Sequence, residues 1–155
     1  MPRTLVQRFV EDVRVVVRNA RRPTAEEFDA HVAEAARLLQ STRVVLVVLV
    51  GDGAEVVFDS LQRAKLSHAG AFARPHAVLA PALRPEIITG MTWLGATIRS
   101  FGPHQLDRAC DFLEIAEPVR PALSDGIAAM KIELQADRPA TAAAGLESRR
   151  VDGGS

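Results

Sequence analysis

The run RVVLVVLV at residues 43–50 constrains the fold more than any other stretch of this chain. Its side chains are almost all β-branched or aliphatic, polar residues do not alternate with them, and the run stops at Gly51. A run this short and this uniformly apolar is typical of a strand that is covered on both faces. The sequence therefore predicts a central strand in a sheet that lies between layers of helices.

Two shorter β-prone runs, residues 5–10 and 13–18, precede the central strand, and the two acidic residues between them are typical of a hairpin with a tight turn. In the second run Arg14 and Arg18 share one face with Val16, because side chains in a strand alternate between its two faces. We expect that face to be partly solvated. We also expect the first strand to lie at or near an edge of the sheet.

The segments on either side of the central strand carry helix signals. Thr24 followed by Glu27 forms a capping-box pattern, which predicts a helix start, and Gly70 is a natural end for a second helix over residues 54–68. The predicted buried stripes are Phe28, Val32, Ala35 and Leu39 in the first helix, and Val57, Leu61 and Ala64, beside Phe58, in the second.

Further strands are predicted at residues 75–80 and 96–101, with a third helix that begins at Arg84 and Pro85. A fourth helix follows the second of these strands, and a last helix follows a joint marked by two prolines. The predicted buried residues of these two helices are Leu106, Ala109 and Leu113, and then Ile127, Met130 and Leu134. Ser124 or Asp125 is expected to cap the last helix.

Single helices alternate with strands after the hairpin, an order that favours right-handed crossovers and parallel pairing. The predicted fold is therefore α/β: a mixed, largely parallel sheet of four to five strands with an N-terminal hairpin and about four helices. One domain is predicted over residues 1–135 of the 155. Within it, residues 118–135 form a helical appendage that docks either on the body or on a second subunit. Residues 136–155 are small, polar and poor in apolar anchors, which predicts a disordered tail.

Charge and cysteine content exclude several classes of protein. Nineteen basic residues balance nineteen acidic ones, so no net charge attracts nucleic acid. The single cysteine, Cys110, cannot form an intramolecular disulfide, and the N-terminus lacks the apolar core of a secretory signal, so we expect a cytoplasmic protein. The longest apolar run is far shorter than the roughly 20 residues that span a bilayer, so no transmembrane segment is predicted.

With this order of elements, the chain resembles the STAS superfamily, the fold of anti-sigma-factor antagonists, and within it the SpoIIAA-like, SEC14-like branch. The resemblance covers roughly residues 5–115. It rests on four segments in the same order: RRPTAEEFDAHV, RVVLVVLVGDG, RPHAVLAPALRPE and ATIRSFGPHQLDRACDFL. The resemblance implies a STAS-like α/β domain with a regulatory role and no catalysis.

The best known chemistry of the family is reversible phosphorylation of a serine in a D-S-S-G motif at the start of the helix after the central strand. Here that place reads Phe58-Asp59-Ser60-Leu61, which keeps Asp59 and Ser60 but lacks the second serine and the glycine. The resemblance implies phosphoregulation at Ser60, since a helix N-terminus suits a phosphate group. If the helix instead begins near Ala54, Ser60 lies more than a turn inside it and is an ordinary exposed helical serine.

Gly51, Asp52, Gly53 and Glu55 follow the carboxyl end of the predicted central strand, where open α/β sheets usually bind their ligands. The glycines would let a ligand approach the backbone, and Asp52 or Glu55 would accept hydrogen bonds or hold a cation. Alternatively, both glycines only permit positive φ in a tight turn, and Asp52 caps the next helix. The segment is not a P-loop, because no lysine-serine pair follows it.

Histidine and cysteine form no recognisable metal or catalytic motif. The four histidines are His31, His68, His76 and His104, and neither an H-x-x-x-H nor a C-x-x-C spacing occurs. Cys110 lies among apolar residues of a predicted helix, as a small core residue does. We therefore predict no catalytic residue, no bound metal and no cofactor.

The predicted function is that of a noncatalytic cytoplasmic regulatory or interaction domain that resembles STAS proteins. A protein partner is expected to contact the segment of residues 51–60 and the neighbouring predicted helices over residues 54–68 and 85–94. The expected binding or regulatory residues are Gly51, Asp52, Gly53, Glu55, Asp59 and Ser60. The alternative is a carrier of a small apolar, lipid-like ligand, in a SEC14-like pocket lined by Val48, Phe58, Ile88 and Met91. An enzyme is the third class, for which Asp52, Glu55 and His76 would be mutated first. A homodimer is compatible with the first two classes.

Overall fold

The fold is built on one five-stranded sheet with the strand order β1-β2-β3-β4-β5. The computed structural model describes residues 3–19, 21–51, 60–81, 89, 92, 95 and 97–136. The strands are β1 (Leu5–Val10), β2 (Val13–Arg18), β3 (Val44–Leu49), β4 (His76–Leu79) and β5 (Ile98–Phe101). β1 is antiparallel to β2, and every other neighbouring pair is parallel. The predicted α/β class is confirmed, with its mixed and largely parallel sheet, its N-terminal hairpin and its central strand β3.

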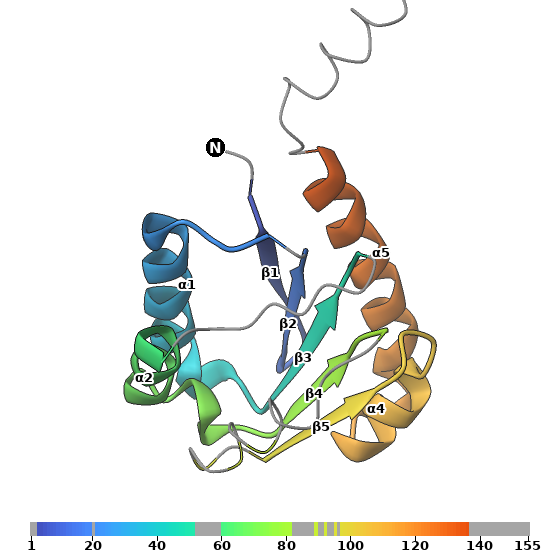
Figure 1. Ribbon diagram of the computed structural model, residues 1–155. Coiled ribbons are helices and arrows are strands. Elements are labelled where there is room, and N and C mark those ends of the chain that lie inside the picture. Colours follow the sequence, from blue (N-terminus) through green and yellow to red (C-terminus); the bar gives the residue numbers. More distant parts are fainter. Residues whose placement is uncertain are drawn as a thin grey trace, which may run out of the picture.

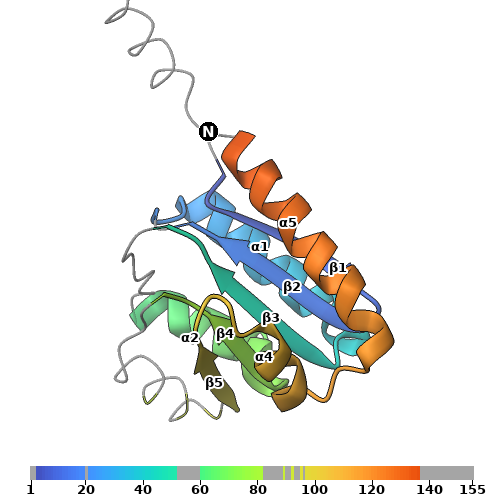
Figure 2. The same ribbon diagram turned by 90° about the vertical axis from the view of Figure 1, so that its right-hand side faces the viewer.

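Helices cover both faces of this sheet, as Figure 1 and Figure 2 show. α1 (Ala25–Arg37) and α2 (Ser60–His68) lie on one face, whereas α4 (Leu106–Phe112) and α5 (Arg120–Ala136) lie on the other. Short 3-10 helices follow α1, α2 and α4, namely η1 (Leu39–Ser41), η2 (Ala71–Ala73) and η3 (Glu117–Val119). Because the parallel strands are added in sequence order and crossovers are right-handed, the crossover helices α1 and α2 share a face. The opposite face is left for the C-terminal helices.

The face under α4 and α5 is a dry, apolar core. Val13, Val15 and Val17 of β2 point to this side, and none of them is more than 1% exposed. The helices contribute Ala109, Cys110, Leu123, Ile127, Met130 and Leu134 to the same cluster. The C-terminal helix therefore packs on the sheet of its own chain, along the buried stripe predicted for it.

α5 begins earlier than predicted, at Arg120. Pro121 lies in its first turn, where the missing N–H needs no partner and the fixed φ suits a helix. Pro121, which was expected to belong to a joint before the helix, is therefore part of the helix and favours its start. Ser124 and Asp125 lie inside α5, so the prediction that one of them caps it is wrong.

α2 turns a different side to the sheet from the one predicted. Leu61 is 66% exposed and Ala64 is exposed as well, whereas Leu66 is 4% exposed and packs with Phe28 and Phe72. Leu66 lies about 140° around the helix from Leu61, so burying one of them exposes the other. The predicted buried stripe is therefore wrong at Leu61 and Ala64.

The predictions about segment limits have mixed outcomes. Gly70 follows α2 with a φ of +78°, which confirms its place at the end of that helix. The start of the helix predicted at residues 54–59, most of the third predicted helix and residues 137–155 lie outside the described residues. Among the described helices, none combines the length and the hydrophobicity that a membrane-spanning segment requires.

Candidate functional site

Two of the predicted site residues lie within the described part of the chain. Gly51 follows β3 at its carboxyl end, is exposed and has a φ of +114°, as its interpretation as a turn residue requires. Ser60 is exposed at the beginning of the described part of α2, and its Oγ accepts a hydrogen bond from Nη2 of Arg63 at 3.3 Å. The other four, Asp52, Gly53, Glu55 and Asp59, lie outside the described residues.

Two buried arginines lie on the face of the sheet that α1 covers. Arg14 and Arg18 of β2 are 4% and 5% exposed, so the prediction that this face is partly solvated is wrong. Alternation along the strand correctly predicted that both arginines share one face. The helix layer covers that face and excludes water from it. Nη1 of Arg14 donates a hydrogen bond to Oε1 of Gln7 at 3.0 Å. A buried guanidinium group needs hydrogen bonds and opposite charge nearby. The residues around Arg14 and Arg18 must therefore supply both.

α1 brings acidic side chains close to both arginines. Glu27 and Glu34 lie about two turns apart on one side of α1, and Arg14 and Arg18 lie on one face of β2. Burial lowers the pKa of both arginines to about 10, and a nearby carboxylate opposes this effect, Glu34 at Arg14 and Glu27 at Arg18. Both guanidinium groups are therefore charged at neutral pH. We name Glu27, His31 and Glu34 of α1, together with Arg14 and Arg18 of β2, the α1–β2 ladder.

His31 occupies the middle of the α1–β2 ladder and is 6% exposed. Burial lowers its pKa to about 3, and the positive charges of Arg14 and Arg18 act in the same direction. Within the described residues its Nδ1 has no hydrogen-bond partner. His31 is therefore neutral at neutral pH. A sequence signal for its burial exists, since it stands three residues after Phe28 and four before Ala35, on the buried stripe of α1.

A second buried histidine, His76 of β4, lies in the same row of the sheet as Arg14, with Val45 between them. It is 4% exposed, and burial lowers its pKa to about 4, although its hydrogen bond with the Arg74 carbonyl oxygen acts against the shift. That bond measures 2.7 Å from Nδ1, so Nδ1 carries the proton of the neutral ring. The ring of Phe72 lies 6.0 Å away, measured between centroids. Like His31, His76 is neutral at neutral pH.

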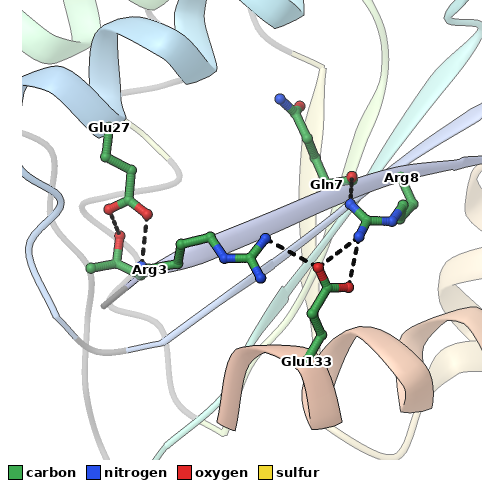
Figure 3. Close-up of polar contacts among 6 residues, drawn as sticks. Arg3, Gln7, Arg8, Glu27 and Glu133 are labelled. Carbon is green, nitrogen blue, oxygen red and sulfur yellow. Dashed lines mark hydrogen bonds and ion pairs between the residues drawn. The ribbon is translucent and has the colours of Figure 1, made fainter. Parts of the chain in front are cut away.

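The first turn of α1 is tied to the N-terminal strand through Glu27. Thr24 caps the helix as predicted, since its side chain accepts a hydrogen bond from the Glu27 amide at 3.1 Å. The Glu27 carboxylate binds the amide of Thr4 at 2.8 Å and the Thr4 hydroxyl at 2.6 Å (Figure 3). The second half of the capping box, in which this carboxylate would return to Thr24, is thus replaced by a contact between α1 and the start of β1.

The opposite helix layer holds the same strand through Glu133 of α5. Nη2 of Arg8 lies 2.7 Å from both carboxylate oxygens of Glu133, and Nη1 of Arg3 lies 3.1 Å from one of them (Figure 3). These side chains are partly exposed, so each ion pair stabilises the fold only modestly. Together, Glu27 and Glu133 position the edge strand from both faces of the sheet.

Replacing Glu27 tests the importance of the contact between α1 and β1. Glu27→Ala removes two hydrogen bonds to Thr4 and the carboxylate next to Arg18, so we expect the free energy of unfolding to fall by about 2 kcal/mol. Glu26→Ala is the matched control, because Glu26 is an exposed residue in the same helical turn and should change stability by less than about 0.5 kcal/mol. Urea denaturation followed by circular dichroism measures both. Equal losses in the two variants would contradict the role assigned to Glu27.

The single cysteine of the chain serves the core. Cys110 is completely buried, and burial raises the pKa of its thiol, which disfavours the reactive thiolate. No group of three or more histidine, cysteine, aspartate or glutamate side chains is placed to hold a metal ion within the described ranges. The described residues thus present a buried polar layer, the α1–β2 ladder, and an exposed helix, α2.

The pocket predicted for an apolar ligand is described at one position. Val48 points to the α4 and α5 face, where it is 4% exposed and belongs to the dry core. Phe58, Ile88 and Met91 lie outside the described residues. On the other face, the α1–β2 ladder places charged groups between the helix and the sheet, a poor lining for an apolar ligand.

Comparisons with protein-family models, with curated proteins and with solved structures each found no match. The resemblance to the STAS superfamily thus stays a prediction from the sequence.

Proposed function

We propose that this protein is a noncatalytic cytoplasmic regulatory domain of the STAS, SpoIIAA-like kind, which binds a protein partner through the exposed side of α2. The observation that carries the proposal is the exposure of Leu61, 66% of whose surface is open to solvent near the start of the described helix. The partner contacts Leu61 and the segment of residues 51–60 that leads to it.

The surroundings of Leu61 support a binding surface. Ser60 and Ala64 are exposed beside it, and Arg63 reaches back to the Ser60 hydroxyl. Lys65 forms an ion pair of 2.9 Å with Asp29 of α1, which gives this surface a charged border. An apolar residue inside a polar border is the usual arrangement of a protein interface.

Ser60 gives the proposed surface a means of regulation. A phosphate on its Oγ would lie next to the guanidinium group of Arg63, with which it would form charge-assisted hydrogen bonds. The added negative charge would alter the contact of a partner with the neighbouring Leu61. Phosphorylation of Ser60 is therefore part of the proposal.

Affinity capture with matched variants tests the proposed surface. The wild-type protein, Leu61→Asp, Ser60→Asp and Asp59→Arg are immobilised and exposed to native lysate, and retained proteins are quantified by mass spectrometry. Ile132→Asp is the control, because Ile132 is equally exposed, at 68%, but lies on α5 at the other face of the sheet.

We expect one protein to be retained by the wild type and by Ile132→Asp, and to be depleted about tenfold by Leu61→Asp, which corresponds to about 1.4 kcal/mol of binding free energy. Ser60→Asp should also change its retention. Circular dichroism of each variant shows that it is folded. Retention that is the same in all folded variants would refute the surface.

A further inference from the structure

The two helix layers are held to the sheet by different kinds of contact. On the α4 and α5 side, seventeen buried apolar residues form one continuous cluster. On the α1 and α2 side, the buried apolar residues that the structure describes form clusters of four and three, and the α1–β2 ladder brings charged side chains between α1 and β2. Stability is not uniform across a fold, and regions with less apolar burial open first. α1 therefore has a weaker apolar attachment than α5, since its buried apolar residues are Phe28 and Ala35, whereas α5 buries Leu123, Ile127, Met130 and Leu134.

The charged groups around His31 have partners that do not include the imidazole. On β2 it faces the two cations Arg14 and Arg18. On its own helix, Glu27 binds Thr4, and Glu34 binds Arg37 with an oxygen 3.0 Å from Nε. On β4 the nearest titratable group is neutral His76, and from α2 Lys65 pairs with Asp29 on the outer side of α1.

A proton on His31 would place a third positive charge between two buried arginines. The imidazolium would need a second acceptor at Nδ1, for which the described residues provide no partner. Both effects disappear when α1 leaves the sheet and the ring enters water. Acid therefore acts on the ladder through His31, in the middle of the helix.

We propose that the α1–β2 ladder is an acid-sensitive latch, in which protonation of His31 releases α1 from the sheet while the α4 and α5 layer stays folded. The proposal does not depend on the partner surface at Leu61. His76 is not part of the latch, because it packs beside Phe72 of η2 and its Nδ1 binds a backbone carbonyl next to its own strand.

The direction of the effect follows from the two protonation states. His31 is neutral when α1 is docked, with a pKa of about 3, and regains its ordinary pKa of 6.5 when α1 is released. Release therefore takes up a proton below pH 6.5. Between about pH 7.5 and about pH 5, the equilibrium constant for release should rise about 30-fold.

Hydrogen exchange measured by mass spectrometry tests the latch on the full chain. Peptides from α1 and α5 are compared at the two pH values, after correction for the intrinsic exchange rate. We expect α1 to be less protected than α5 at both values, and its exchange to accelerate about 30-fold in acid. Equal protection of α1 and α5 at both values would overturn the proposal, because it would show that only the whole domain opens.

Two variants separate the latch from general acid lability. In His31→Gln the ring that takes up the proton is absent, so the acid acceleration in α1 should disappear. In His76→Gln it should persist, because His76 stays packed when α1 is released. Acceleration that survives His31→Gln, or that is lost in His76→Gln, would overturn the assignment to His31. If His31→Gln does not fold, the comparison of α1 with α5 in the wild type decides the question.

Discussion

Lowering the pH from about 7.5 to about 5 is expected to reduce the free energy of global unfolding by about 4 kcal/mol. The cause is the pair of buried histidines, His31 and His76, which are neutral in the folded protein. A loss of this size is a large fraction of the stability of an ordinary domain of this length. It would bring the folded state close to its stability limit under mildly acidic conditions.

The sign follows from the direction of the two pKa shifts. In the folded state the pKa of His31 is about 3 and that of His76 about 4, both below the ordinary value of 6.5 that the unfolded chain restores. Below pH 6.5 the unfolded chain therefore binds two protons that the folded chain does not. The stabilisation is complete above that pH and is lost as the pH falls toward 4 and 3. At about pH 5 each histidine contributes about 2 kcal/mol of the loss.

Urea denaturation at several pH values measures this dependence. His31→Gln and His76→Gln should each remove about half of it, and the double variant should remove nearly all of it. The variants also lower stability at neutral pH, so the slope with pH is the informative quantity. An unchanged slope in both single variants would show that other groups cause the acid lability.

Leu123→Ala is expected to destabilise the protein by about 3 kcal/mol, because it removes a large aliphatic side chain from a packed core and leaves a cavity. Leu123 of α5 is 0% exposed and belongs to the apolar cluster under α4 and α5, together with residues of β1, β2 and β3. The loss would show that the C-terminal helix is an integral part of the domain core.

Ile132→Ala is the matched control for Leu123→Ala. It removes an aliphatic side chain from the same helix, at a position that is 68% exposed, and should change stability by less than about 0.5 kcal/mol. Chemical denaturation followed by far-ultraviolet circular dichroism measures both variants. If the two losses agree within about 1 kcal/mol, α5 does not contribute to the core in the way its burial indicates.

Local signals were sufficient for the fold class. The apolar run at residues 43–50 became β3, because a uniformly apolar run is typical of a strand covered on both faces, and the β-prone run at residues 13–18 became β2. Thr24 capped α1 and Gly70 ended α2, because a cap and a left-handed turn each depend on one side chain and its neighbours. These features need no knowledge of distant residues.

The candidate site was predicted less well, because its residues depend on contacts that are distant in the sequence. Leu61 was assigned to the interior of the fold, but the packing of Leu66 against Phe28 rotates the described helix and exposes it. The spacing of the α1 stripe already contained His31, yet a histidine at such a position is equally compatible with a boundary residue. Its burial between two arginines depends on where α1 lies over β2.

The order of residues in this chain is enough to predict an α/β domain with a hairpin edge, an interior β3 and the helices α1, α2 and α4 that follow β2, β3 and β5. Burial of Arg14 and Arg18 is a different kind of property, because a side chain is buried only when another element covers its face. Glu27 and Glu34 lie close enough to these arginines to oppose the effect of burial because α1 docks with its acidic residues over β2. Alternation along a strand shows which side chains share a face, whereas the docking of a helix decides whether that face is wet.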